Sequence, residues 1–317
     1  MKENHRTAVI ALGGNAISDP RKEDTIANQF AHTRKSLTGV IELLRKKFNL
    51  AITHGNGPQV GNALLRVELS FPDAPYVPLG VLVADTQGSM GYMIEQSLQN
   101  ALKIAGMERE VVTIVTQVLV NKDDPSLSDP TKFVGKTYPE TEARRLAEKF
   151  HWTIKPYGDK GWRRVVGSPI PISIINSEAI KRLVEKGMVV IASGGGGIPV
   201  YMEPDGRYEG VDAVVDKDRA AAVLGRDIGA EKLIILTNTP YVFLDYGKPS
   251  QREIRKMTTS EAKQYLADGQ FPPGSMGPKV GAAVKFLENG GEKVIICELE
   301  EVLDAIEGNA GTVMVAG

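Results

Sequence analysis

The sequence predicts an α/β fold with a mainly parallel central sheet, because short apolar runs alternate with segments of helical periodicity. The runs are rich in Val, Ile and Leu, which is typical of strands buried on both faces of a parallel sheet. They span residues 8–12, 50–53, 111–118, 188–192, 233–236, 294–297 and 313–315. A chain of 317 residues with 42% hydrophobic content can bury a large core around such a sheet.

Helices are expected between these strands. Five apolar residues between the first two runs are spaced four, seven, four and three positions apart, which places them on one helical face over the sheet. These residues are Ile26, Phe30, Leu37, Ile41 and Leu44. Further helical patterns occupy residues 219–224, 259–268 and 280–289. Two helix starts match a capping box, namely Thr258 with Glu261 and Thr137 with Glu140.

Residues 121–171 interrupt this alternation. They combine an Asp- and Pro-rich stretch with one isolated amphipathic helix at 140–150 and two tryptophans. We expect them to leave the central sheet and form a protruding subdomain or lid. Residues 198–208, centred on Pro204-Asp205-Gly206, predict a β-hairpin.

The composition excludes several classes of protein. Lys and Arg number 38 and Asp and Glu 39, so 38 − 39 = −1, and the net charge gives no drive toward nucleic acid or an anionic membrane. Cys297 is the single cysteine, so no intrachain disulfide can form and a reducing compartment is favoured. The first residues lack the organisation of a signal peptide or a membrane span. A cytoplasmic protein is expected.

Glycine-rich loops follow three predicted strands: Gly13-Gly14-Asn15, Gly55-Asn56-Gly57, and residues 194–197. Ligands bind where parallel strands end at a common edge of the sheet. Backbone N–H groups in glycine loops can approach phosphate oxygens closely, and a following helix N-terminus adds partial positive charge. A turn alone could require each glycine, but three such loops together favour an anion site.

Two familiar phosphate motifs do not fit. The third glycine of a dinucleotide fingerprint would stand at Val60, and no acidic residue follows at the required distance. Gly135-Lys136-Thr137 resembles the end of a P-loop, but the glycine needed five positions earlier is Pro130.

Lysines in glycine-rich or acidic contexts are the candidates for phosphoryl transfer, because a migrating phosphoryl group needs cations placed around it. Lys217 lies between Asp216 and Asp218 at an expected helix start, where Asp218 could cap the helix and orient neighbouring ammonium groups. Lys279 ends a Gly/Pro-rich loop that runs into another helix. Either lysine could instead be an ordinary solvated side chain.

Other chemistries have weaker support. The four histidines show no metal-ligand spacing, and His54 is interpreted first as a residue that orients its glycine loop and second as a general base. Cys297 is expected to be buried at a strand end. Arg163 and Arg164 could stack or bind an anion, or could belong to an exposed strand.

Five segments, taken in order, resemble the signatures of the carbamate kinase branch of the amino acid kinase family. They are residues 11–16 (ALGGNA), 54–61 (HGNGPQVG), 194–199 (GGGGIP), 210–218 (GVDAVVDKD) and 274–279 (GSMGPK). Residues 129–132 (DPTK) resemble the motif of the family's protruding subdomain. Other branches carry a lysine where this sequence has Ala11, which favours the carbamate branch. Phe133 and residues 237–240 depart from the usual pattern.

The resemblance implies a homodimer of three-layer α/β/α subunits that transfers a phosphoryl group reversibly between ATP and carbamate, usually toward ATP. Residues 1–220 would form the carbamoyl phosphate half, with the protruding subdomain at about 121–171, and residues 221–317 the nucleotide half. Mg²⁺ would bridge the nucleotide phosphates. The implied catalytic residues are Lys217, Lys279, Asp218 and Lys132. The implied substrate-binding residues are Gly13, Gly14, Asn15, His54, Gly55, Asn56 and Gly57. The implied nucleotide-binding residues are Gly195, Gly196, Thr237, Asn238, Tyr246, Met276 and Gly277.

Three alternatives remain open. A kinase of the same fold could act on another small acid. A non-catalytic module could sense nucleotides, although sensing would not need Lys217, Asp218 and Lys279 together. A dinucleotide oxidoreductase is disfavoured by the failed fingerprint.

Overall fold

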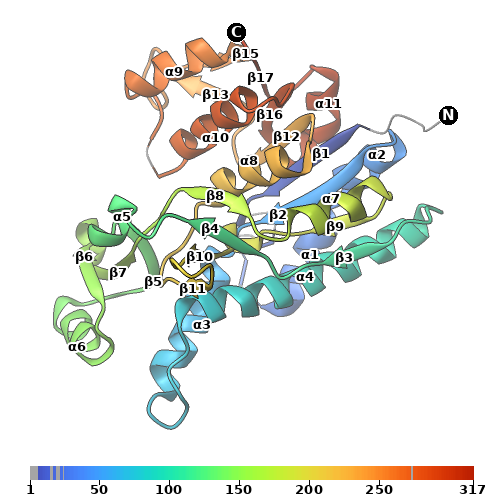
Figure 1. Cartoon of the computed structure of the whole chain (residues 1–317). Helices are drawn as coiled ribbons and strands as arrows, with labels where there is room; N and C mark the ends of the chain where they lie inside the picture. Colours follow the sequence, from blue (N-terminus) through green and yellow to red (C-terminus); the bar gives the residue numbers. More distant parts are fainter. Residues whose placement is uncertain (1–5, 15–16, 19–21, 24, 273) are drawn as a thin grey trace.

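A central sheet of eight strands organises the molecule in the computed structural model, which describes residues 6–14, 17–18, 22–23, 25–272 and 274–317 (Figure 1). In spatial order the strands are β15 (Lys256–Thr258), β17 (Thr312–Val315), β16 (Lys293–Glu298), β12 (Lys232–Thr237), β1 (Thr7–Leu12), β2 (Asn49–His54), β9 (Val189–Ile191) and β3 (Val111–Thr113). Neighbouring strands are parallel except β16 and β17. The predicted mainly parallel sheet is confirmed.

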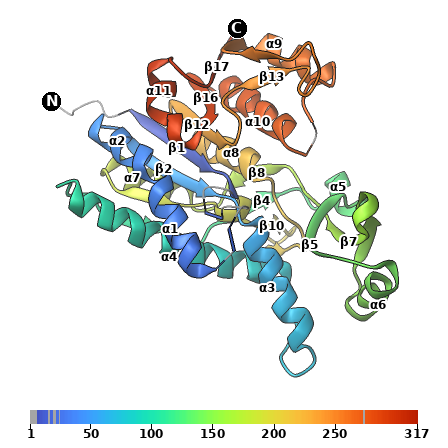
Figure 2. The same cartoon turned by 180° about the vertical axis from the view of Figure 1, so that it is seen from behind.

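The alternation of side chains along each strand produces three layers. On β1, Val9 and Ala11 belong to one buried cluster, whereas Ile10 and Leu12 belong to the cluster on the opposite face. The first face is covered by α7 (Ser177–Glu185), α8 (Lys217–Ile228), α9 (Thr259–Ala267) and α10 (Met276–Glu288). The second is covered by α1 (Ile26–Ser36), α2 (Thr38–Arg45), α4 (Leu79–Ile104) and α11 (Val302–Glu307) (Figure 2). The expected α/β/α sandwich is therefore present.

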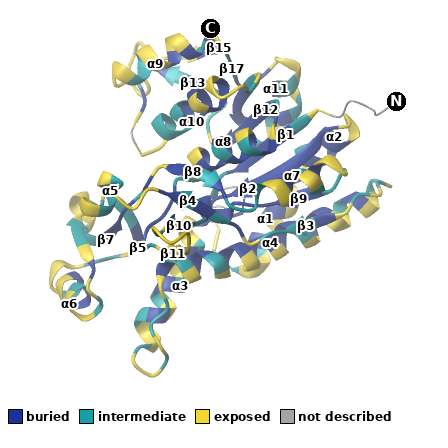
Figure 3. Ribbon diagram, in the orientation of Figure 1, coloured by how far each residue is buried: buried dark blue, intermediate teal, exposed yellow. Residues whose placement is uncertain are grey.

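A smaller antiparallel sheet forms the protruding subdomain, in the order β5 (Lys132–Tyr138), β7 (Trp162–Val166) and β6 (Thr153–Pro156). Helix α6 (Glu140–Phe150) packs on it, and its outer face is exposed (Figure 3). The subdomain rests on α3 (Gly57–Ser70), where Leu64 joins Val134 and Trp152 in a third buried cluster. The short α5 (Pro125–Ser128) and the 3₁₀ turn η2 (Gly158–Lys160) complete this region. A protruding subdomain is thus part of the fold, as the predicted fold class has it, and its expected bounds of about 121–171 stay a prediction.

A second sheet links the subdomain to the body. Its strands are, in order, β11 (Tyr208–Gly210), β10 (Ile198–Met202), β4 (Gln117–Val120) and β8 (Pro171–Ile174). Strands β10 and β11 are antiparallel, which confirms the predicted hairpin. The remaining elements are the ribbon of β13 (Val242–Leu244) and β14 (Arg252–Ile254) and the 3₁₀ turns η3 (Gly194–Gly196) and η4 (Leu299–Glu301). In the described part of the chain, every helix is too short or too polar to cross a bilayer.

Three local predictions need correction. The single strand expected at 111–118 is two strands in two sheets, β3 and β4. The single helical face expected from Ile26 to Leu44 is divided between α1 and α2 at Leu37, and Ile26 is 60% exposed. The capping box at Thr258 is present, but the one at Thr137 is not, because Thr137 is paired in β5 and Pro139 precedes α6.

The 26-residue helix α4 was not among the predicted elements. Glycines in its interior resemble loop signals in the sequence. Packing explains one of them, because a Cβ atom on Gly91 would lie 2.2 Å from the Thr113 side chain of β3. Close contact between helix and strand therefore requires a residue that weakens the helical pattern.

Candidate active site

A cavity of about 420 Å³ opens at the carboxyl ends of β1, β2 and β12. Parallel strands end at this edge, so the loops that follow them meet there. The described residues that line the cavity are Gly13, Gly14, Gly55, Asn56, Gly57, Pro58, Lys132, Gly195, Val214, Val215, Asp216, Lys217, Asp218, Leu236, Thr237, Asn238, Gly274, Ser275, Pro278 and Lys279. Most of the predicted substrate-binding residues and all four predicted catalytic residues are among them.

Two lysines from distant parts of the chain meet at one carboxylate. Lys217 Nζ lies 2.5 Å from Asp218 Oδ1, and Lys279 Nζ lies 2.9 Å from Asp218 Oδ2. The side chains of Lys217, Lys279 and Asp218 are 16%, 14% and 5% exposed, so water screens these contacts only weakly. The Lys217–Asp218–Lys279 cluster thus holds two ammonium groups on one carboxylate at the cavity wall.

The three residues hold each other in charged form. Burial opposes charge on Asp218, but the two ammonium groups outweigh it and keep the pKa of Asp218 below its ordinary value. For Lys217, burial lowers the pKa below its ordinary value, and Asp218 counteracts part of that effect. Removing Asp218 would therefore weaken the hold of Lys217 on its proton.

Helix α8 sets the position of this cluster. Asp216 is its N-cap, and Asp216 Oδ1 accepts hydrogen bonds from the backbone N–H groups of Asp218 and Arg219 at 3.0 and 3.2 Å. The first turn then directs Lys217 and Asp218 into the cavity. At the other end, Gly229 stops the helix in a left-handed conformation with φ of 71°.

Two more helices begin at the cavity. Gly57 is the first residue of α3, and Lys279 lies in the first turns of α10. Among the described residues, no side chain caps the first turn of either helix. Gly277 already donates its N–H to the Pro272 carbonyl, and Pro58 and Pro278 have no N–H to give. The remaining N–H groups of the two first turns can face an anion, and the helix dipoles add partial positive charge.

Close packing explains two of the glycines. A Cβ atom on Gly55 would lie 3.1 Å from Lys217 Cδ, so the glycine makes room for the lysine stem. A Cβ atom on Gly195 would lie 2.3 Å from Asn56 Nδ2, and Gly195 has φ of 67°. The glycines thus bring the loop after β9 and the loop after β2 together.

Asn56 and His54 have different surroundings. Asn56 lines the cavity and donates a hydrogen bond from Nδ2 to Thr86 Oγ1 of α4 at 2.9 Å. His54 is buried below the loop, and burial lowers its pKa to about 4. A Cβ atom on Gly194 would lie only 2.3 Å from His54 Nε2, so the imidazole packs directly against this glycine. His54 packs beneath the glycine loop and does not line the cavity, which favours the orienting role over the general base.

Lys132 reaches the cavity from the subdomain. Its Nζ lies 3.4 Å from Asp216 Oδ2.

Strand β7, which pairs with the strand of Lys132, carries Arg164. The Arg164 side chain is 4% exposed and forms an ion pair with Asp212. Its guanidinium carbon lies 4.9 Å from the centre of the Trp152 ring. Of the two alternatives left open for Arg164, stacking is confirmed and exposure is wrong.

Asp212 also accepts a hydrogen bond from the backbone N–H of Leu79, the first residue of α4, at 3.1 Å. The Arg164–Asp212 pair therefore joins the subdomain to the body near the site.

A second cavity of about 280 Å³ adjoins the first and shares Thr237, Asn238, Ser275 and Lys279 with it. Its other described lining residues are Thr239, Phe243, Tyr246, Phe271, Pro272 and Met276. Aromatic and apolar side chains of this kind suit the flat ring of a nucleotide base. Four of the predicted nucleotide-binding residues, Thr237, Asn238, Tyr246 and Met276, line this cavity.

Some predicted residues lie elsewhere. Gly195 lines the first cavity and not the second. Gly196 is buried against the Val215 carbonyl, and Gly277 packs near the Pro272 carbonyl. Asn15 lies outside the described residues. The cap of α8 is Asp216 and not Asp218 as expected, because Asp218 lies in the first turn and turns its carboxylate to the two lysines. An Asp directly before a helix start is a recognisable N-cap signal, whereas no pattern in the sequence assigned a role to Asp212.

The described residues contain no group of three or more His, Cys, Asp or Glu side chains arranged to hold a metal ion. Two carboxylates, those of Asp216 and Asp218, are among the described residues that line the first cavity. They fit Mg²⁺ carried on nucleotide phosphates, because Mg²⁺ commonly binds substrate phosphates with only one or two protein carboxylates.

A parallel α/β sheet with glycine loops, uncapped helix N-termini and two buried lysines at one edge defines a phosphoryl-transfer enzyme. The amino acid kinase family profile matches residues 6–298. The chain belongs to the amino acid kinase family. The carbamate kinase of Pyrococcus furiosus is 44% identical over 309 residues, which cover 97% of this chain and 98% of that protein. The carbamate kinase of Thermococcus kodakarensis is 44% identical over 313 residues, which cover 98% of this chain and 99% of that protein.

A solved structure has the same fold throughout. The carbamate kinase of Giardia lamblia bound to AMP-PNP superposes with a TM-score of 0.93 at 35% identity, over 99% of each chain. The resemblance to the carbamate kinase branch found in the sequence is confirmed, and so is the three-layer fold.

Proposed function

We propose that the protein is a carbamate kinase, which transfers a phosphoryl group reversibly between ATP and carbamate and gives ADP and carbamoyl phosphate. The observation that carries the proposal is the convergence of Lys217 and Lys279 on Asp218 in a glycine-lined cavity. The full-length similarity to carbamate kinases supports this choice of substrate.

The reaction needs charge neutralisation more than proton transfer. A carbamate oxygen is already anionic, so it can attack phosphorus without a general base, and the buried, weakly basic His54 is not required. As the phosphoryl group moves, negative charge spreads over its equatorial oxygens. Lys217 and Lys279 stabilise that charge from the cavity wall, and the positive ends of the α3 and α10 helix dipoles add to this stabilisation.

Asp218 is a positioning residue in this scheme. It holds both ammonium groups and keeps them from moving apart through mutual repulsion. The described lining residues of the first cavity include three ammonium groups, of Lys132, Lys217 and Lys279, against the two carboxylates of Asp216 and Asp218. The resulting excess of positive charge favours a phosphorylated ligand.

The two substrates occupy adjoining cavities. Carbamoyl phosphate binds in the first cavity among Gly14, Gly55, Asn56 and Gly57, within residues 1–220. The nucleotide base binds in the second cavity beside Tyr246 and Met276, within residues 221–317, and its phosphates point toward Lys279, which lines both cavities. Mg²⁺ on those phosphates would lower the charge repulsion between the nucleotide and the incoming anion.

The functional test measures the rate of ATP formation from ADP and carbamoyl phosphate in a coupled assay. We expect turnover by the wild type, loss of at least 10²-fold in kcat for Lys217→Ala and Lys279→Ala, and normal turnover for Lys256→Ala, a matched change at an exposed lysine on the edge strand β15. A panel of other acyl phosphates separates carbamate from other small acids. Near-normal turnover of both cavity variants would contradict the assigned roles, and ligand binding without any turnover would indicate a sensing module.

We also propose a homodimer, formed through the outer face of α4. Val81 and Tyr92 of α4 are exposed apolar side chains on one face, with the small residue Gly88 between them, and Ile26 of α1 lies exposed on the same layer. Sedimentation should give a dimer for the wild type and for Leu69→Glu, which changes an exposed leucine on α3. Tyr92→Glu should give a monomer, and a Tyr92→Glu dimer would exclude this face.

The cytoplasmic location stays a prediction from the sequence.

A further inference from the structure

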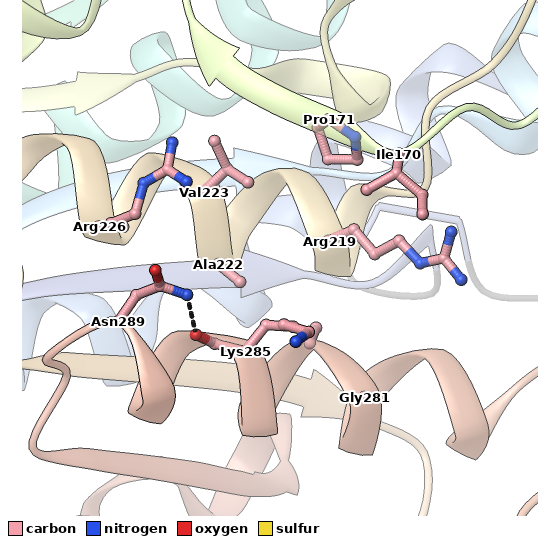
Figure 4. A pocket seen from close by; sticks show the side chains of 10 residues that line it. Ile170, Pro171, Arg219, Ala222, Val223, Arg226, Gly281, Lys285 and Asn289 are labelled. Atoms are coloured by element: carbon pink, nitrogen blue, oxygen red, sulfur yellow. Dashed lines mark hydrogen bonds between the residues drawn. The ribbon is translucent and has the colours of Figure 1, made fainter. Parts of the chain in front are cut away.

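A groove separate from both cavities described above is lined by residues further along α8. It has a volume of about 310 Å³, within the range of small-molecule sites, and lies between α8 and α10 (Figure 4). The described residues that line it are Ile170, Pro171, Arg219, Ala222, Val223, Arg226, Gly281, Ala282, Lys285 and Asn289. None of them lines either cavity of the candidate active site.

The lining of this α8–α10 groove is apolar in the middle and cationic at its rim. Figure 4 shows Ala222 pointing from α8 toward α10, and Arg219 extending past Ile170 at one end of the groove. No carboxylate is present among the described lining residues. This distribution of charge is complementary to an elongated molecule with an apolar body and an anionic end.

Arg219 is the cation best placed to bind such an anion. Arg226 is already held by Asp227 and by the Ile172 carbonyl, and Lys285 pairs with Glu288. Arg219 is exposed and forms no ion pair within 4 Å with a described carboxylate, although its charge acts on the nearby Asp124. Its guanidinium can therefore form a bidentate contact with an incoming carboxylate.

Gly281 keeps the groove open. Glycine is a poor helix former, so one in the interior of α10 needs a reason. Gly225 of α8 has one, because a Cβ atom there would lie 2.6 Å from the Phe286 ring. A Cβ atom on Gly281 would meet no described atom within 4 Å, so packing within the chain does not require this glycine. Its lack of a side chain instead leaves space for a molecule beside α10.

The groove is linked to the candidate active site through both of its walls. Helix α8 begins at Lys217, and α10 carries Lys279 in its first turns. The contact between Lys279 and Asp218 joins the N-terminal ends of the two helices. A molecule that fills the groove contacts both helices, so it biases their spacing and hence the geometry of the two ammonium groups.

We propose that the α8–α10 groove binds a small amphiphilic carboxylate, with its apolar chain between the helices and its carboxylate on Arg219, and that binding changes the rate of phosphoryl transfer. The second half of this statement rests on the proposed function, and the first half does not. Octanoate, hexanoate, acetate and octylamine are suitable probes, because they separate the contribution of the chain from that of the charge.

Calorimetric titration of the full chain tests binding without any enzyme assay. We expect saturable binding of octanoate, weaker binding of hexanoate, and none of acetate or octylamine. Gly281→Leu fills the groove and should abolish binding, whereas Gly281→Ala, which adds only a Cβ atom, should retain it. Arg219→Gln should weaken binding about tenfold, and Arg182→Gln on the exposed face of α7 should not change it.

Initial rates with and without octanoate then test the coupling. We expect at least a twofold change in kcat or in KM for carbamoyl phosphate in the wild type and none in Gly281→Leu. Binding without a change in rate would overturn the regulatory half only. Absence of saturable binding, equal binding of octylamine, or unchanged binding by Gly281→Leu would overturn the site. A change of oligomeric state in Gly281→Leu would assign the groove to a second copy of the chain instead, which also overturns the proposal.

Discussion

Replacing Asp218 by Asn should separate the charge of this residue from its shape. The amide has nearly the same size but no negative charge, so Lys217 and Lys279 would face each other with only a neutral acceptor between them. Each hydrogen bond between charged groups contributes about 1.5–3 kcal/mol, so the two bonds together contribute ~3–6 kcal/mol. The three side chains are well below one-third exposed, so solvent screening reduces this figure little.

The variant should lose both stability and activity. We expect the free energy of unfolding to fall by about 3–5 kcal/mol, which is typical when a buried ion pair loses one partner. Turnover should fall ~10²–10³-fold, because the ammonium groups no longer keep the positions in which they stabilise the moving phosphoryl group. Denaturant titration and the coupled ATP-forming assay measure the two quantities. Asp205→Asn at the tip of the β10–β11 hairpin is the control.

The pH dependence gives a second readout. The pKa of Lys217 already lies below its ordinary value of 10.5, so activity should decline in the alkaline range as this ammonium group loses its proton. Without the charge of Asp218 that pKa falls further, and the decline should move to lower pH in Asp218→Asn. Wild-type kcat together with an unshifted alkaline limb in the variant would refute the reasoning.

Four further outcomes are expected. The pKa of Asp218 in the folded protein lies below its ordinary value of 3.8, so its carboxylate contributes its full stabilisation at pH values above 3.8. This contribution should be lost as the pH falls through the folded-state pKa, which an acid titration of the free energy of unfolding would record. Arg164→Leu should raise KM for carbamoyl phosphate about tenfold with kcat changed less than threefold, because the subdomain that carries Lys132 loses its bond to Asp212; equal losses in kcat and kcat/KM would contradict this. Gly55→Ala should lower kcat ~10-fold or more while circular dichroism stays unchanged, since the added methyl group displaces the Lys217 stem. Cys297, whose pKa burial raises to about 12, should react with thiol reagents only after unfolding, and fast labelling of the native chain would count against its burial.

The parts of the fold that follow from local chemistry could be predicted from the sequence. Buried parallel strands produce apolar runs that do not depend on distant residues, so β1, β2, β12 and β16 were located to within one residue at each end. The capping box at Thr258 is equally local. Helix α4 was missed because its glycines meet a tertiary requirement, the contact of Gly91 with Thr113, which a sequence pattern does not reveal.

The candidate site shows the same division. Glycine loops at strand ends and the acidic setting of Lys217 indicated an anion site, but no pattern showed that Lys279, 61 positions after Asp218, shares its carboxylate. That position came from resemblance to the family. The burial of His54 under Gly194 and the ion pair of Arg164 with Asp212 depend on contacts between segments far apart in the chain, so their local sequences left the alternatives open.

Residues 212–218 contain three aspartates that each fix a different part of the molecule. Asp212 contacts the subdomain and the start of α4, Asp216 caps α8, and Asp218 holds the paired lysines. The number of residues between them is therefore constrained as strictly as their identity. Deleting or inserting a single residue here would shift all three anchors at once, so a chimaera between relatives should exchange this stretch whole or leave it untouched.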